Sequence, residues 1–232
     1  MLNKNARIGI IGAMQIETEG LRAAMTDKHE ETVCGITFTV GKLEGVDVVT
    51  ATSGVGKVAA ALCAAAMLLC FDVTALLNTG VAGGLAKGLV VGDVVVADKV
   101  VQHDMDTTAL GDPKGLVSGL NLVYIPTDKA LSDVLVAASR AKGLNTMTGT
   151  VASGDLFVAN AADKARIANE FGAAACEMEG AAIGQVAYTG GVPFAVLRAI
   201  SDGGDGMEFS EFVTLAAARS VAVTREFVKR LK

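Results

Sequence analysis

Short apolar runs alternate with stretches of helical periodicity along most of the chain. The apolar runs predict strands over Arg7–Ile11, Thr32–Thr39, Asp47–Thr52, Val73–Asn78, Asp93–Val101, Asn145–Ala152, Ala173–Met178 and Pro193–Ile200. The periodicity predicts helices over Gln15–Met25, Lys57–Cys70, Asp128–Lys142, Ala162–Phe171, Glu179–Tyr188 and Phe209–Leu231. Nearly continuous apolar strands are typical of a sheet covered on both faces. We therefore expect one α/β domain over residues 1–232, with a central mixed twisted β-sheet flanked by helices on both faces.

The region between Asp104 and Gly119 interrupts this alternation. It is polar and rich in glycine, so we expect a long loop there. A loop of that length in a compact domain usually has a function. No linker, internal repeat or low-complexity tract divides the rest of the chain.

Composition excludes several classes of protein. Hydrophobic residues make up 51% of the chain, so it can bury a large core and is not expected to be disordered. Aromatic residues make up only 4% and the net charge is −5, which argues against a nucleic-acid partner. The longest apolar run, Val58–Phe71, is too short to span a bilayer, and no targeting segment is recognisable. We therefore expect no membrane partner.

The cysteines and histidines argue against a metal centre. The four cysteines have no CxxC spacing, and His29 and His103 are the two histidines of the chain. Cys63 and Cys70 are two turns apart on one face of a predicted helix, and we expect both thiols to be buried. Reduced cysteines fit a cytoplasmic protein. We expect no metal ion and a cytoplasmic location.

Residues suited to chemistry follow nearly every predicted strand. In open α/β sheets, ligands bind beyond the carboxyl ends of the strands. The segments expected there carry glycine or acids, and they are Gly12–Glu17, Ser53–Lys57, Thr79–Gly84, Ser153–Val158, Glu177–Glu179 and Arg198–Asp202. Together they predict a pocket of backbone amides and carboxylates with few cations. Such a pocket favours glycoside chemistry over binding of an anionic substrate.

The segment Gly54–Ala59 favours a different class, the dinucleotide-binding oxidoreductases. It has the outline G-x-G-x-x-A between a strand and a helix. That fingerprint also needs an acid at the end of the next strand, but Asp72 precedes the strand and Asn78 ends it. A P-loop is excluded because Val58 follows Lys57. An oxidoreductase is therefore the alternative hypothesis.

The acids have structural as well as functional interpretations. Glu17 lies in the first turn of a predicted helix, where the macrodipole favours an acid. Glu177 and Glu179 end a buried strand, where carboxylates are costly unless they are bound. Arg198 and Asp202 could form a buried ion pair.

Six segments, taken in order, resemble the bacterial 5′-methylthioadenosine/S-adenosylhomocysteine nucleosidases of the nucleoside phosphorylase superfamily. They are Ile8–Met14 with Glu17, Ser53–Ala60, Asn78–Gly80, Ser153–Asp155, Glu177–Glu179 and Arg198–Asp202. The resemblance covers essentially the whole chain, and the order of several motifs makes it specific. It implies a nucleoside phosphorylase-like fold and an N-ribosyl hydrolase of methionine salvage that needs no cofactor. It also implies adenine nucleosides as substrates, and a homodimer in which the loop 104–119 lies near the partner's site.

The resemblance further implies roles for individual residues. Glu17 matches the acid that activates the attacking water, and Asp202 matches the acid that protonates adenine at N7. Glu179 matches the carboxylate that binds the ribose hydroxyls. The remaining residues implied are Ser201 beside Asp202, Met178 under the sugar, Arg198 near the water and Glu179, Phe157 and Val158 against the base, Gly83 close to the ligand, and Met14, Val55 and Phe209 on the 5′-alkylthio side.

The sequence departs from the family pattern in three places. Val81 stands where members often have a small polar residue. The segment between Asp202 and Phe209 is short and rich in glycine, and the region 104–119 matches poorly. The ranking of 5′-methylthioadenosine, S-adenosylhomocysteine, 5′-deoxyadenosine and aminodeoxyfutalosine as substrates therefore stays open.

A third hypothesis is a nucleoside-binding module without catalysis. Such a module would keep Phe157 and Glu179 but would need neither Glu17 nor Asp202. Release of adenine from methylthioadenosine, compared with turnover of NADH, separates the three hypotheses.

Overall fold

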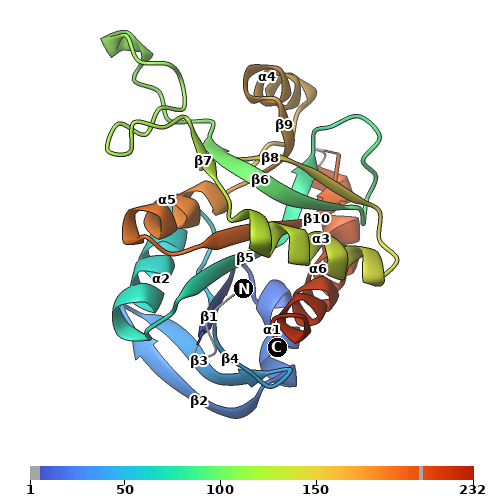
Figure 1. The fold of residues 1–232 in the computed structure, drawn as a ribbon. Helices are drawn as coiled ribbons and strands as arrows, with labels where there is room; N and C mark the ends of the chain where they lie inside the picture. Colours follow the sequence, from blue (N-terminus) through green and yellow to red (C-terminus); the bar gives the residue numbers. More distant parts are fainter. Residues whose placement is uncertain (1–5, 204–205) are drawn as a thin grey trace.

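The computed structural model describes residues 6–203 and 206–232 (Figure 1). Within these residues there are ten strands and six α-helices. The strands are β1 (Ile8–Gly12), β2 (Thr26–Val33), β3 (Ile36–Leu43), β4 (Val46–Thr52), β5 (Ala75–Gly84), β6 (Val94–Gln102), β7 (Tyr124–Pro126), β8 (Thr146–Ser153), β9 (Ala173–Glu177) and β10 (Phe194–Asp202). The helices are α1 (Gln15–Ala24), α2 (Lys57–Cys70), α3 (Lys129–Ala141), α4 (Ala161–Phe171), α5 (Gly180–Gly190) and α6 (Gly206–Lys229).

The described strands form one mixed sheet. Its order is β10-β6-β8-β9-β5-β1-β4-β3-β2, and β7 pairs with β6 beside this path. β10 also pairs with β5, in parallel, so the strands from β10 to β5 close into a ring. β1 runs parallel to β5 and β4, whereas β3 is antiparallel to both β4 and β2. The mixed sheet predicted from the sequence is confirmed.

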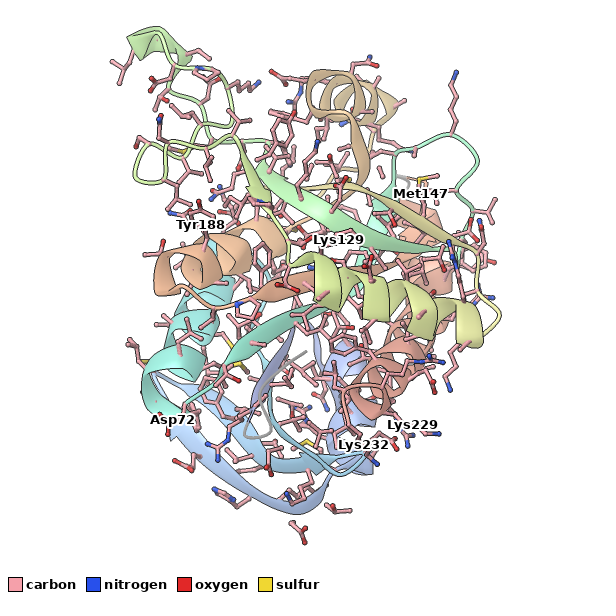
Figure 2. The ribbon with its side chains drawn as sticks, viewed as in Figure 1. Asp72, Lys129, Met147, Tyr188, Lys229 and Lys232 are labelled. Carbon is pink, nitrogen blue, oxygen red and sulfur yellow. The ribbon has the colours of Figure 1, made fainter. Side chains whose placement is uncertain are left out.

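Helices cover both faces of this sheet, as expected. Helices α2 and α5 pack together on one face, and α1, α3 and α6 pack on the other (Figure 1). Apolar side chains fill both interfaces (Figure 2), with Met67 and Ile183 on the first face and Leu21, Leu135 and Phe227 on the second. Burial of each such side chain contributes about 1.5–3 kcal/mol. The sheet is therefore held rigidly, and so are the residues at its strand ends.

The predicted strand Thr32–Thr39 is wrong. Cys34 and Gly35 adopt φ values of 52° and 76°, and this turn separates β2 from β3. β2 was not predicted because its residues are polar and exposed along nearly the whole strand. An edge strand with both faces in solvent has no apolar alternation to reveal it.

β5 extends beyond its predicted end at Asn78. The segment Gly80–Gly84, expected to follow the end of the strand, continues it. It does so because Gly80 and Gly83 pair with Arg198 and Asp202 of β10. This pairing fixes the glycines beside the acids that follow the other strands.

The prediction that both helical cysteines are buried is correct for one of them and wrong for the other. Cys63 is buried, but Cys70 is exposed because α2 ends at that residue. In the loop region 104–119, the structure has a short 3₁₀ turn at Thr108–Leu110 and otherwise irregular backbone. Among the described residues, no helix combines the length and the apolar character needed to cross a bilayer.

Candidate active site

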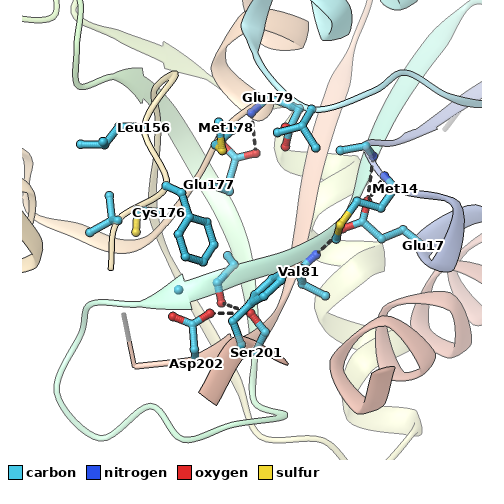
Figure 3. A pocket seen from close by; sticks show the side chains of 17 residues that line it. Met14, Glu17, Val81, Leu156, Cys176, Glu177, Met178, Glu179, Ser201 and Asp202 are labelled. Carbon is cyan, nitrogen blue, oxygen red and sulfur yellow. Dashed lines mark hydrogen bonds between the residues drawn. The ribbon is translucent and has the colours of Figure 1, made fainter. Parts of the chain in front are cut away.

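A pocket opens where six strands end, as the sequence predicted. We call it the strand-end pocket, and it spans about 610 Å³ including its opening to solvent, which leaves room for a small organic ligand (Figure 3). The carboxyl ends of β1, β4, β5, β8, β9 and β10 and the start of α6 supply its walls. It is lined by Ala13, Met14, Glu17, Val55, Val81, Ala82, Gly83, Leu156, Phe157, Val158, Cys176, Glu177, Met178, Glu179, Ser201, Asp202 and Phe209.

The predicted site residues come together in this pocket, with the exception of Arg198, which lies behind its wall. Figure 3 shows Glu17 with Met14 and Val81 at one end, and Asp202 with Ser201 along another side. The lining residues to which sequence reasoning gave no individual role are Ala13, Val81, Ala82, Leu156, Cys176 and Glu177. All of them except Cys176 fall within the strand-end segments that were expected to line the pocket, and Cys176 directly precedes one of those segments.

Glu17 is held in place by three backbone amides. Its Oε2 accepts the N–H groups of Ala13 at 2.7 Å and Met14 at 2.9 Å, and its Oε1 accepts that of Val81 at 2.9 Å. Burial raises the pKa of Glu17, while Arg198 and the three amides partly oppose that rise. A fixed carboxylate with a raised pKa is well suited to take a proton from water near neutral pH.

Asp202 reaches the same pocket because β10 is irregular at its end. Successive residues of a strand normally point to opposite faces, but the register with β5 shifts between Ile200 and Asp202. Ser201 and Asp202 therefore both line the pocket. The Ser201 hydroxyl donates to Asp202 Oδ2 at 2.7 Å, which orients the carboxyl group.

Glu179 lies between β9 and α5. β9 ends at Glu177, and Glu179 is the residue that precedes the first turn of α5. Its Oε1 accepts the N–H of Gly56 at 2.9 Å, and its Oε2 lies 3.6 Å from Arg198 Nη2. Burial and the neighbouring charge of Glu177 raise the pKa of Glu179 to about 7, although Arg198 and Gly56 pull it down.

Arg198 is fully buried, and its strongest partners were not predicted. Its Nη2 donates to Asn78 Oδ1 and to the carboxylate of Glu177. Glu179, the partner expected from the family resemblance, is the more distant acid. The buried ion pair of Arg198 was considered with Asp202, but the acid in direct contact with Arg198 is Glu177.

Two rings from distant parts of the chain meet at the pocket. Phe157, after β8, is half-exposed, and its ring meets that of Phe209 in α6 edge to face at 5.3 Å. Val158 is buried beside them, and Met178 lines the pocket next to Glu179. These side chains give the pocket flat apolar surfaces on which a purine and a sugar can stack.

The helix start at Gly54–Ala59 does not offer a dinucleotide site. A pyrophosphate would need the free amides of this helix N-terminus. The N–H of Gly56 is bound by Glu179, and the N–H of Lys57 is bound by Asp155 Oδ1 at 2.8 Å. Carboxylates occupy the amides that a phosphate would use, which argues against the oxidoreductase hypothesis.

The arrangement combines four carboxyl groups in one pocket with apolar walls, and Arg198 and backbone amides bind that of Glu177. Three of these groups can activate water, protonate a leaving group and hold hydroxyls. They are the fixed carboxylate of Glu17, the carboxyl group of Asp202 that Ser201 orients, and the carboxyl group of Glu179 between β9 and α5. In the described part of the chain, no group of three or more His, Cys, Asp or Glu residues is placed to hold a metal ion.

Comparisons with known proteins agree with this geometry. The model of the phosphorylase superfamily matches residues 7–229. The 5′-methylthioadenosine/S-adenosylhomocysteine nucleosidase of Haemophilus influenzae strain PittEE is 43% identical over 230 residues, which cover 97% of this chain and 100% of that protein. The chain therefore belongs to the phosphorylase superfamily and, within it, to the family of 5′-methylthioadenosine/S-adenosylhomocysteine nucleosidases. The resemblance predicted from the motifs is confirmed.

Solved structures of related proteins share the fold. The S-adenosylhomocysteine nucleosidase of Streptococcus pyogenes, in complex with 5-methylthiotubericidin, is 36% identical with a TM-score of 0.95 and covers 100% of both chains. The futalosine hydrolase of Helicobacter pylori strain 26695 is 34% identical with a TM-score of 0.93, and the match covers 97% of this chain and 98% of that one. The nucleoside phosphorylase-like fold predicted from the sequence is confirmed.

Proposed function

We propose that this chain hydrolyses the N-glycosidic bond of 5′-methylthioadenosine and S-adenosylhomocysteine. The products are adenine and the 5-substituted ribose, as in methionine salvage and the recycling of S-adenosylmethionine by-products. The observation that carries this proposal is the placement of Glu17, Glu179 and Asp202 in one apolar pocket. 5′-Deoxyadenosine is a further candidate substrate. No cofactor takes part in the proposed reaction.

The chemistry needs an acid and a base on different sides of the sugar. Adenine is a poor leaving group until N7 gains a proton, which Asp202 supplies. The ribosyl carbon then develops oxocarbenium-like charge, and the water deprotonated by Glu17 attacks the opposite face. General acid and general base catalysis each contribute about 10²–10⁴ in rate.

Glu179 binds the 2′ and 3′ hydroxyls and places negative charge near the developing cation. Phe157 stacks on the base, the backbone of Val158 binds the purine edge, and Met178 lies under the sugar. Gly83 allows a close approach, and Met14, Val55 and Phe209 surround the 5′-alkylthio group. Val81 adds an apolar wall at that end, beside Met14 and Phe209.

Adenine release tests this function directly. Purified protein is mixed with 5′-methylthioadenosine, S-adenosylhomocysteine, 5′-deoxyadenosine or aminodeoxyfutalosine, and free adenine is measured. We expect rapid release from the first two. Turnover of NADH without adenine release would support an oxidoreductase, and binding without turnover would support a nucleoside-binding module.

We expect kcat/KM to fall at least about tenfold for each pH unit below about pH 7. The pKa of Glu179 is raised to about 7, and that of Glu17 is raised as well. Both carboxyl groups act in their ionised forms, so their protonation as the pH falls removes activity. A pH profile of adenine release measures this, and an acidic limb near pH 4, the ordinary range of glutamate, would contradict it.

Replacing Gly80 by alanine should lower turnover by about tenfold or more. A methyl group at this position would fall on Glu17 Oε1 and Arg198 Nη1, and would lie 2.8 Å from Glu17 Cδ. The two side chains would have to move out of their present geometry. Steady-state kinetics and a melting curve measure the effect, with Glu30→Ala as the control because Glu30 is exposed on β2. Normal kinetics in a folded Gly80→Ala variant would show that the present Glu17 geometry is not required.

The chain is proposed to act as a homodimer, with the loop 104–119 near the partner's site. An apolar groove between α2 and α5 supports this proposal, because Val58 and Leu69 on α2 are exposed along it. Exposed apolar surface of this kind is typical of an interface.

A cytoplasmic location is also proposed, since all four cysteines are free.

Light scattering should give about twice the chain mass of 23.6 kDa at micromolar concentration. Leu69→Lys places a charge on the groove and should shift the protein toward the monomer mass. Val90→Lys is the matched control, since Val90 is also exposed but lies in the connection between β5 and β6. A wild-type mass near 23.6 kDa would contradict the dimer.

A further inference from the structure

Glu177 is the most completely bound carboxylate of the strand-end pocket, and the proposed mechanism gives it no role. Its Oε1 accepts the Ser153 hydroxyl and the N–H of Gly180, and its Oε2 accepts the N–H of Glu179 at 3.0 Å and that of Gly180 at 2.8 Å. Arg198 Nη2 also donates to Oε2. A carboxylate has about four acceptor positions, so Glu177 has no capacity left for a ligand.

The first part of its role concerns the start of α5. The first amides of a helix lack partners, and the residue at the N-cap usually supplies a side-chain acceptor. Glu179 occupies that position, but its side chain makes no capping bond. Glu177 and Ser153 bind the amides instead, Ser153 through a 2.7 Å bond from the N–H of Ala181. The carboxylate of Glu179 therefore remains available to the pocket.

The second part concerns the charge of Arg198. A fully buried guanidinium needs an anion, because an unpaired charge in the interior is strongly unfavourable. Glu177 is in direct contact with it, whereas Glu179 lies 3.6 Å away. Without the Glu177 charge, Arg198 would draw on Glu179, and also on Glu17, whose Oε1 lies near Arg198 Nη1 over Gly80.

We propose that Glu177 is a positioning residue for the nucleosidase reaction: it caps α5 and binds Arg198, and thereby keeps the carboxylate of Glu179 free for the ribose hydroxyls. This inference rests on the proposed function. Glu177 acts through Glu179 and Arg198 and does not itself touch the reacting atoms.

The same contacts predict how the pH profile depends on Glu177. The groups that face Glu179 are Glu177 of β9, Arg198 of β10, Glu17 of α1 and the N–H of Gly56 at the start of α2. The charge of Glu177 raises the pKa of Glu179, and Arg198 lowers it. Removing the Glu177 charge removes its repulsion of ionised Glu179 and leaves the attraction by Arg198 in place. The ionised form of Glu179 is then stabilised, so its pKa falls. The acidic limb of kcat/KM should move to lower pH.

The test compares Glu177→Gln and Glu177→Asp with the wild type in adenine release from 5′-methylthioadenosine. For Glu177→Gln we expect KM to rise about tenfold or more, with a smaller change in kcat, because the ribose carboxylate is drawn toward Arg198. The acidic limb should move down by about one pH unit. Glu177→Asp keeps the charge but shortens the side chain, so KM should rise while the acidic limb stays near its wild-type position.

Glu30→Gln, on the exposed face of β2, is the matched control and should behave as the wild type. A purely structural role for Glu177 would lower the amount of active protein without moving KM or the acidic limb, and that result would overturn the proposal. If Glu177→Gln does not fold, Glu177→Asp decides: a raised KM supports the proposal, and wild-type kinetics overturn it. A wild type that releases no adenine would instead refute the proposed function.

Discussion

Glu17→Gln should reduce adenine release by about 10²–10⁴-fold, because the amide cannot accept a proton from water. The glutamine side chain has nearly the same shape as glutamate, and residue 17 lines one end of the pocket. Binding of 5-methylthiotubericidin, the ligand of the Streptococcus pyogenes structure, should change much less. Steady-state kinetics together with calorimetric binding separates the two effects.

Glu19→Gln is the matched control for this variant. Glu19 lies two residues along the same helix and is exposed, so its loss should leave both turnover and binding unchanged. Near-normal adenine release from Glu17→Gln would remove Glu17 from the mechanism. Loss of analogue binding along with turnover would point to a structural role for its three amide bonds.

Asp202→Asn should block adenine release to a similar extent, about 10²–10⁴-fold. Asparagine still accepts the Ser201 hydroxyl, but its amide is not acidic and cannot transfer a proton to N7. A 4-nitrophenyl riboside has a leaving group that departs without protonation, so its hydrolysis should be largely spared. Comparison of kcat/KM for the two substrates measures the share of catalysis that depends on the proton.

Asp98→Asn is the control for Asp202→Asn, since Asp98 is an exposed aspartate of β6. It should turn over both substrates at wild-type rates. Equal losses on both substrates in Asp202→Asn would indicate that Asp202 acts through the structure of the pocket and not as a proton donor.

Helix α2 shows what the sequence could predict about the fold. It begins at Lys57 and ends at Cys70, as expected, because Gly56 adopts a φ of 102° that favours glycine and the alanine-rich run strongly favours a helix. β2 shows the opposite case, since its polar residues become a strand only through pairing with β3. The local pattern of apolar residues predicts elements that bury one face. It misses elements that form only because they pair with a neighbouring strand.

The same distinction between local pattern and full fold applies to the site residues. Glu17, Glu179 and Asp202 could be placed because each follows a strand whose carboxyl end faces the pocket. The partner of Arg198 could not be placed, because the choice between Glu177 and Glu179 depends on how β9 ends and α5 begins. That turn sends the two glutamates to different roles although they are two residues apart. The edge-to-face contact of Phe157 and Phe209 likewise depends on the full fold.

Hydrolysis, as opposed to phosphorolysis, is the central claim of the proposed function. A phosphorylase must hold a phosphate dianion beside the sugar, and cationic side chains are the usual means. Among the described residues that line the strand-end pocket, none is a lysine or an arginine. Arg198 lies behind the wall and is bound by Asn78 and Glu177. Glu17 would repel a phosphate at the position of the nucleophile.

The most direct measurement is therefore the phosphate dependence of 5′-methylthioadenosine cleavage, with identification of the sugar product. The protein is assayed in phosphate-free buffer and again with added phosphate at constant ionic strength. We predict the full rate without phosphate and a free reducing sugar, 5-methylthioribose, under both conditions. A strict requirement for phosphate, with a ribose 1-phosphate as the product, would contradict the account.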